Sequence, residues 1–147
     1  MIESVIVIFF LVLGSIWDVK KKSVPYMYLL LWGIVALVYL ISNSLIKKNG
    51  DIWITMLFGI IPGIVCLLIS YVSREQIGYG DGWAILLMGA LLGISRVMKL
   101  LLAAFSLLTV IAIVLLITKK AKRKSTIPFI PFLFLGYLMV FLYGRFV

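Results

Sequence analysis

The stretch VMKLLLAAFSLLTVIAIVLLIT, residues 97–118, contains a single charged side chain, Lys99. A run of about 20 apolar residues is long enough to cross the hydrocarbon core of a bilayer as a helix. Five further apolar segments precede or follow it, at residues 2–17, 26–46, 52–72, 80–95 and 128–145. We interpret all six as transmembrane helices, because an open sheet cannot satisfy its backbone in lipid and these continuous runs lack the alternating polarity of a closed barrel.

The composition supports this interpretation over the whole chain. Hydrophobic residues make up 65% of the 147 positions, and the mean hydropathy is +1.25. Values this high are typical of an integral membrane protein. The six segments leave no room for a separate soluble domain, so we expect one transmembrane domain over residues 1–147. We expect the first segment to be retained, because Glu3 stands where a signal peptide carries positive charge and no small-residue cleavage site follows.

Basic residues in the connections predict the orientation. With both termini outside, nine Lys and Arg lie in cytoplasmic connections, including the run at residues 119–124, and five lie outside. Positive charge favours the cytoplasmic side, so we expect an N-out, C-out protein of the cytoplasmic membrane. We place the weakest helix boundary near residues 96–99, where two basic residues interrupt an almost unbroken apolar run. The net charge of +9 is therefore a topological signal, and we expect no nucleic-acid partner.

Missing residue types restrict the chemistry. The chain has no histidine and one cysteine, Cys66, in an apolar run where a buried role is expected. A zinc or other soft-metal site is therefore not expected, and neither are Ser-His or Cys-His nucleophile pairs. We expect no cofactor.

Two aspartates stand at the edges of apolar segments, Asp18 after the first and Asp81 before the fourth, in a chain with five acidic residues. Ionisable residues at lipid are costly and point to function. The predicted topology places both on the cytoplasmic face. Two carboxyl groups can hydrolyse an amide, one as base towards water and the other as acid towards the carbonyl, and they should titrate as a coupled pair. Taken singly, Asp81 is explained as a helix cap after a glycine turn, and Asp18 as a partner of Lys21 or Lys22.

Several neighbouring residues have simpler or supporting roles. Gly78 and Gly80 permit unusual backbone angles and close approach of a substrate strand beside Asp81. Gly59 and Gly63, four residues apart with Pro62 between them, indicate close helix packing or a kink in the third segment, with packing as the simpler interpretation. Glu75 either attracts a basic substrate or, more simply, pairs with a neighbour or solvent.

At these aspartates the chain resembles the type IV prepilin peptidase family, the GxGD membrane aspartic proteases that include archaeal preflagellin peptidases. Three stretches carry the resemblance: DVKKKSVP at 18–25, GYGD at 78–81 and IPFIPFL at 127–133. The resemblance implies that Asp18 and Asp81 are the catalytic pair, with Gly78, Gly80 and Pro25 as supporting motif residues. It also implies cytoplasmic cleavage of a short basic leader from type IV pilin-like precursors, commonly after a glycine.

The chain departs from the family pattern in three ways. Tyr26 follows the motif proline where Asn or Asp is usual, and Trp83 stands where lysine is common. These differences concern substrate preference more than catalysis. Larger members have a cysteine-rich zinc-binding region and N-methylate the new terminus. This chain has one cysteine and lacks that region, so we predict peptidase activity without methyl transfer.

Two other functions fit parts of the pattern. A small ion-coupled transporter would use the aspartates as proton or cation sites, but such sites usually lie near the membrane midplane in repeated folds. Here the two aspartates lie at the predicted membrane–water interface, and the sequence shows no internal repeat. An intramembrane protease of the presenilin type shares the glycine-aspartate motif. Those chains are longer and carry a tyrosine before the first aspartate, where Trp17 stands here.

Overall fold

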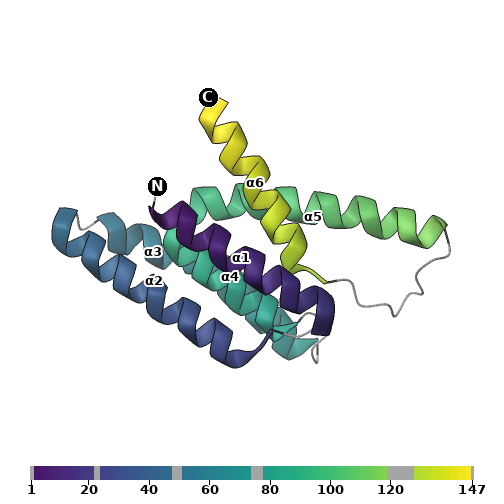
Figure 1. Ribbon diagram of the computed structural model, residues 1–147, viewed down its shortest axis with the longest axis horizontal. Helices are drawn as coiled ribbons and strands as arrows, with labels where there is room; N and C mark the ends of the chain where they lie inside the picture. Colours follow the sequence, from purple (N-terminus) through teal and green to yellow (C-terminus); the bar gives the residue numbers. More distant parts are fainter. Residues whose placement is uncertain (1, 22–23, 48–50, 74–77, 119–127, 147) are drawn as a thin grey trace.

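The computed structural model describes residues 2–21, 24–47, 51–73, 78–118 and 128–146. These ranges contain six helices and no strand (Figure 1): α1 Ile2–Lys21, α2 Tyr26–Lys47, α3 Asp51–Val72, α4 Tyr79–Leu92, α5 Ile94–Ile117 and α6 Ile130–Phe146. The predicted all-helical class is confirmed. The predictions for Lys22, Glu75 and the basic run at 119–124 lie outside the described residues.

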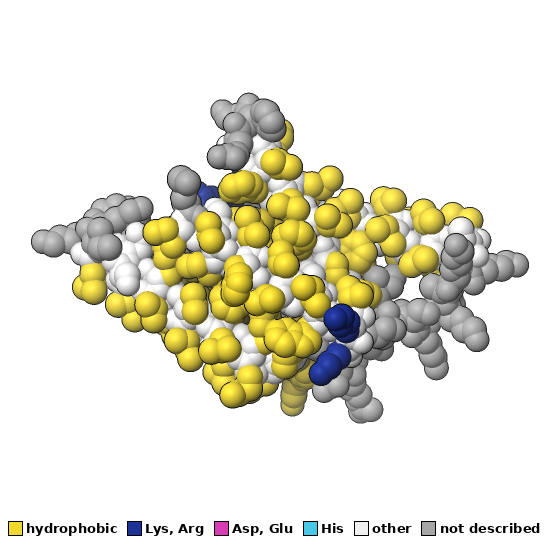
Figure 2. All heavy atoms as spheres, viewed as in Figure 1, with side chains coloured by type: hydrophobic (Ala, Val, Ile, Leu, Met, Phe, Trp, Pro, Cys, Tyr) yellow, Lys and Arg dark blue, Asp and Glu magenta, His cyan; other side chains and the backbone are white. Residues whose placement is uncertain are grey.

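Four of the helices, α1, α2, α3 and α5, are long and apolar enough to cross a membrane. Large hydrophobic side chains are exposed along them, as at Phe58 and Leu102, and apolar side chains dominate the face drawn in Figure 2. So much exposed apolar surface favours contact with lipid. The chain is therefore a multi-pass helical membrane protein, while a count of six spans and the N-out, C-out orientation remain predictions.

The short helix α4 lies at the centre of the helical bundle. It has 14 residues, and nine of them are buried. At 1.5 Å per residue it is about 21 Å long, shorter than the hydrocarbon core. It packs most extensively on α3 and also contacts α2, α5 and α1. A helix that is apolar on all sides suits this buried position.

Glycines allow α3 and α4 to approach closely. A Cβ atom on Gly59 would overlap the carbonyl oxygen of Gly89, and one on Gly63 would overlap the backbone of Leu86. Further along the same antiparallel contact, a Cβ on Gly82 would lie 2.7 Å from the Leu67 side chain. The close packing predicted at Gly59 and Gly63 is confirmed. This seam fixes how far α4 can slide along α3.

The boundary between the fourth and fifth helices differs from the prediction. It lies at Gly93, a single residue between α4 and α5, and not near residues 96–99. Gly93 has φ 77°, a conformation that glycine adopts without strain. A side chain there would also meet Thr55. The prediction was wrong because it placed the boundary at the basic residues, whereas the backbone turn requires a glycine. Arg96 therefore lies inside α5.

We predict that Gly59→Ala destabilises the protein by about 1–3 kcal/mol, because the new methyl group overlaps the backbone of α4 and must push the two helices apart. The unfolding free energy measured by denaturant titration in detergent micelles checks this. Gly144→Ala is the matched control, because nothing lies within 4 Å of that position. Equal stability of the two variants would contradict the glycine seam.

Candidate active site

Asp18 lies in the last turn of α1, which continues to Lys21 and not only to residue 17 as predicted. Its side chain is buried, with 6% of its surface exposed. The Oδ2 atom accepts a hydrogen bond from the backbone N–H of Ile130, the first residue of α6, at 3.0 Å. The backbone N–H of Phe129 also interacts with the carboxylate. Asp18 therefore holds the start of α6 against the end of α1.

The sequence offered Lys21 or Lys22 as ion-pair partners of Asp18, and Lys22 lies outside the described residues. No ion pair joins Asp18 to Lys21 among the described residues. The first N–H groups of a helix have no partner within that helix and carry partial positive charge, so they stabilise a nearby carboxylate. Sequence reasoning missed α6 as the partner. The available signal was the proline-containing stretch at 128–131, which marks a helix start.

Asp81 is half-buried in the first turn of α4. The N-cap position is occupied by Gly78, and no side-chain hydrogen bond caps the helix. The N–H of Asp81 donates to the Gly78 carbonyl at 3.1 Å. The interpretation of Asp81 as a helix cap is therefore wrong. Its carboxylate lies over Gly78, because a Cβ on that glycine would be 3.3 Å from Asp81 Oδ2.

The fold brings the two aspartates to the same end of the bundle, one from the end of α1 and one from the start of α4. Their carboxylates are close enough for the charge of Asp18 to act on Asp81. Like charges held near each other disfavour the doubly ionised state, so such a pair favours sharing one proton. A pair in this state presents one base and one acid, the combination that general acid–base catalysis requires.

The two motif regions of the sequence also meet here. A Cβ on Gly80 would lie 3.1 Å from Cβ of Val24, so this glycine makes room for the residue before Pro25. The Pro25 carbonyl accepts the Tyr28 N–H at 3.0 Å as α2 begins. The space beside Gly80 is thus filled by Val24, whereas the sequence predicted room there for a substrate strand.

Cys66 is a neighbour of the site that the sequence did not indicate. It lies half-buried on α3 and is close enough to Asp81 for the two side chains to interact electrostatically. The prediction of a buried role is therefore met only in part. No group of three or more metal-ligating side chains occurs among the described residues.

A model of the type IV leader peptidase family matches residues 5–144, a range that contains both aspartates and all the motif residues above. No curated protein and no solved structure shows significant similarity to the chain.

The geometry predicts different structural roles for the two carboxylates. Asp18→Leu should lower the unfolding free energy by about 1–3 kcal/mol, because the buried N–H of Ile130 loses its acceptor. Asp18→Asn keeps an acceptor oxygen and should cost less. Asp81→Asn should leave stability nearly unchanged, because Asp81 caps no helix. Denaturant titration in micelles compares the three variants, and an equal loss for Asp81→Asn and Asp18→Leu would refute the distinction.

Proposed function

Because the chain belongs to the type IV leader peptidase family, we propose that it is an aspartic endopeptidase that removes the short basic leader from type IV prepilin-like precursors. The proposal places the protein in the cytoplasmic membrane, with the site facing the cytoplasm. The observation that carries it is the position of Asp18, at the end of α1, and Asp81, at the start of α4, at the same end of the bundle, where the charge of Asp18 acts on Asp81. Family membership favours this activity over the small ion-coupled transporter.

The surroundings of the two carboxylates suggest which is the base. Asp18 accepts a backbone hydrogen bond at the positive end of α6, and such donors favour the ionised form. Asp81 is half-buried near the charge of Asp18, and both conditions favour its protonated form. The shared proton therefore belongs mainly to Asp81. In this assignment Asp18 is the general base and Asp81 the general acid.

The reaction follows from that assignment. The Asp18 carboxylate takes a proton from a water molecule, and the water oxygen attacks the carbonyl carbon of the scissile amide. Asp81 donates its proton to the carbonyl oxygen, which gives a neutral tetrahedral diol. The C–N bond then breaks, the nitrogen takes the proton held by Asp18, and the Asp81 carboxylate recovers a proton from the diol. The pair returns to its starting state, and no covalent enzyme intermediate forms.

Two exposed aromatic side chains lie close to Asp81 in the sequence, in the first two turns of α4. Tyr79 and Trp83 lie on either side of Asp81 in the sequence and are 39% and 43% exposed. Aromatic faces attract cations, so they suit the basic leader of the proposed substrate. We therefore propose that Trp83 contributes to leader recognition and not to catalysis.

We predict that Asp18→Asn and Asp81→Asn each lower the rate of leader cleavage by at least about 100-fold, because each removes one half of the acid–base pair. Purified protein in detergent is mixed with a precursor that has a basic leader, and the product is measured by mass spectrometry. Asp51→Asn, at the start of α3, is the matched acid-to-amide control and should cleave at the parent rate. Normal processing by either site variant would exclude the proposed mechanism.

We also predict a bell-shaped dependence of kcat on pH. At low pH both carboxyl groups are protonated and the base is lost; at high pH both are ionised and the acid is lost. The activity maximum lies where the pair holds one proton. Cleavage rates measured across the pH range at saturating precursor test this, with circular dichroism as a control for unfolding. A rate that rises to a plateau with a single ionisation would contradict a shared proton.

A further inference from the structure

A cavity of about 530 Å³ lies at the opposite end of the bundle from the aspartates. The start of α1, the later part of α2, the beginning of α3 and the α4–α5 joint surround it. Its polar lining includes Glu3, Tyr39, Asn43, Thr55, Arg96 and Lys99. Glu3 and Asp18 are separated by almost the whole length of α1, about 22 Å at 1.5 Å per residue. The cavity is therefore separate from the proposed active site.

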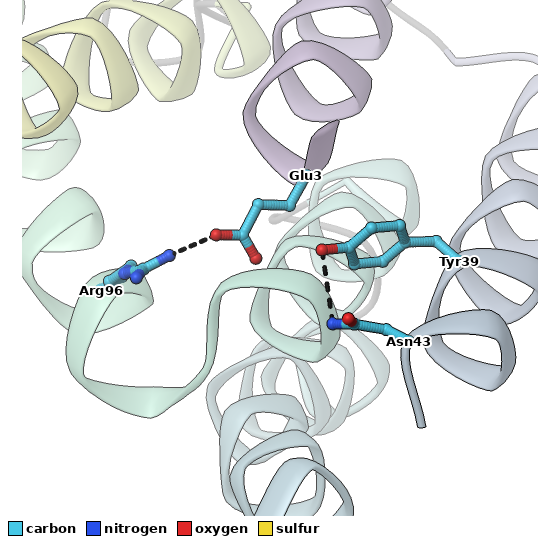
Figure 3. Close-up of polar contacts among 4 residues, drawn as sticks. All are labelled: Glu3, Tyr39, Asn43 and Arg96. Atoms are coloured by element: carbon cyan, nitrogen blue, oxygen red, sulfur yellow. Dashed lines mark hydrogen bonds and ion pairs between the residues drawn. The ribbon is translucent and has the colours of Figure 1, made fainter. Parts of the chain in front are cut away.

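The charged side chains of this cavity favour an anion. Arg96 Nη1 lies 2.7 Å from Glu3 Oε1 (Figure 3), and the Arg96 side chain is 60% exposed. A guanidinium has five N–H donors, so this ion pair leaves others available. Lys99 is exposed one turn further along α5 and has no ion-pair partner among the described residues. Two cations against one carboxylate give the lining a net positive charge.

Neutral donors add to this preference. The side chains of Tyr39 and Asn43 project towards the Glu3–Arg96 pair, and Asn43 Nδ2 lies 3.5 Å from the Tyr39 hydroxyl (Figure 3). The α5 helix starts directly after Gly93 with no side-chain cap, and its first residues line the cavity. Their N–H groups and the positive end of the helix dipole reinforce the two cationic side chains. A phosphate, which has several acceptor oxygens, matches this set of donors.

Neighbouring residues indicate that the phosphate belongs to a lipid. Ile94 lines the cavity and begins a strip on α5 that continues at four-residue spacing through Met98 and Leu102, which are 44% and 69% exposed. Trp53, whose indole N–H donates to Ser44 at 2.9 Å, is 43% exposed near the same end. Tryptophan is enriched at the membrane–water interface. A headgroup in the cavity would thus have apolar surface beside it for its acyl chains.

We propose that this cavity binds the phosphate group of a membrane phospholipid, with Arg96 and Lys99 as the cationic ligands and the acyl chains along the apolar strip of α5. Free inorganic phosphate has the same anionic chemistry but makes no use of that strip. The cavity lies away from the proposed catalytic pair, so phospholipid binding there does not depend on the peptidase activity.

The test measures lipid binding to the full-length protein in detergent by native mass spectrometry and thermal unfolding. The probes are a phosphatidylglycerol, a neutral glycolipid with the same acyl chains, and inorganic phosphate. We expect phosphatidylglycerol to bind and to raise Tm by about 4 °C at saturation, and the other two probes to have little effect. Lys99→Gln should weaken phosphatidylglycerol binding about five-fold, the effect of one basic residue near an anionic lipid. Lys21→Gln, an exposed lysine at the other end of the bundle, is the matched control and should bind as the parent does.

Three results would overturn the proposal. If Lys99→Gln and Lys21→Gln weakened phosphatidylglycerol binding equally, the lipid would be attracted to basic surface in general and not to the cavity. Equal binding of the glycolipid would show that the acyl chains alone are recognised. A full rise in Tm with inorganic phosphate would assign the cavity to the free anion. Because Lys99 is exposed and forms no ion pair within the described part of the chain, its substitution should not disturb folding, and the Tm of each variant without lipid verifies this.

Discussion

The hydrogen bond from the Ile130 N–H to the buried carboxylate of Asp18 is the constraint on which the arrangement of the site depends. It joins the end of the first helix to the beginning of the last, across 112 positions of the sequence. Burying a carboxylate is costly unless donors compensate it, and the unpaired N–H groups of a helix start supply that compensation. The same contact fixes the position of Asp18 and the entry of α6 into the bundle.

The position of Asp81 depends on a different kind of contact. Gly59 and Gly63 on α3 and Gly82 and Gly89 on α4 remove the side chains that would keep these helices apart. Sliding one helix along the other would bring larger side chains to these contact points, where they would clash with the opposite backbone. The two helices therefore have few alternative registers. The contacts between these glycines thereby fix the position along α3 at which α4 begins. Gly80, packed on Val24, places that beginning beside the segment that joins α1 to α2.

Both ends of α1 are thus held by polar contacts. Asp18 contacts α6 at one end, and Glu3 forms an ion pair with Arg96 of α5 at the other. Lipid tails are as apolar as most side chains, so an apolar helix surface without close small-residue contacts resists sliding along its neighbour only weakly. Polar contacts at the two ends of α1 restrict that sliding. The two contacts lie at opposite ends of the molecule, one beside the two candidate aspartates and the other at the net positive cavity.

The sequence by itself determined the helical membrane class, because the length and hydrophobicity of a segment are local properties. The scarcity of acids and the glycine motif were enough to select Asp18 and Asp81 as candidates, and the three motif stretches indicated the family. The tertiary structure alone decided that Asp18 contacts Ile130, that Cys66 lies near Asp81, and that Glu3 pairs with Arg96. It also placed the α4–α5 turn at Gly93. Segments that are apolar on every side do not reveal which face meets which neighbour, so contacts between residues distant in the chain follow only from how the helices pack.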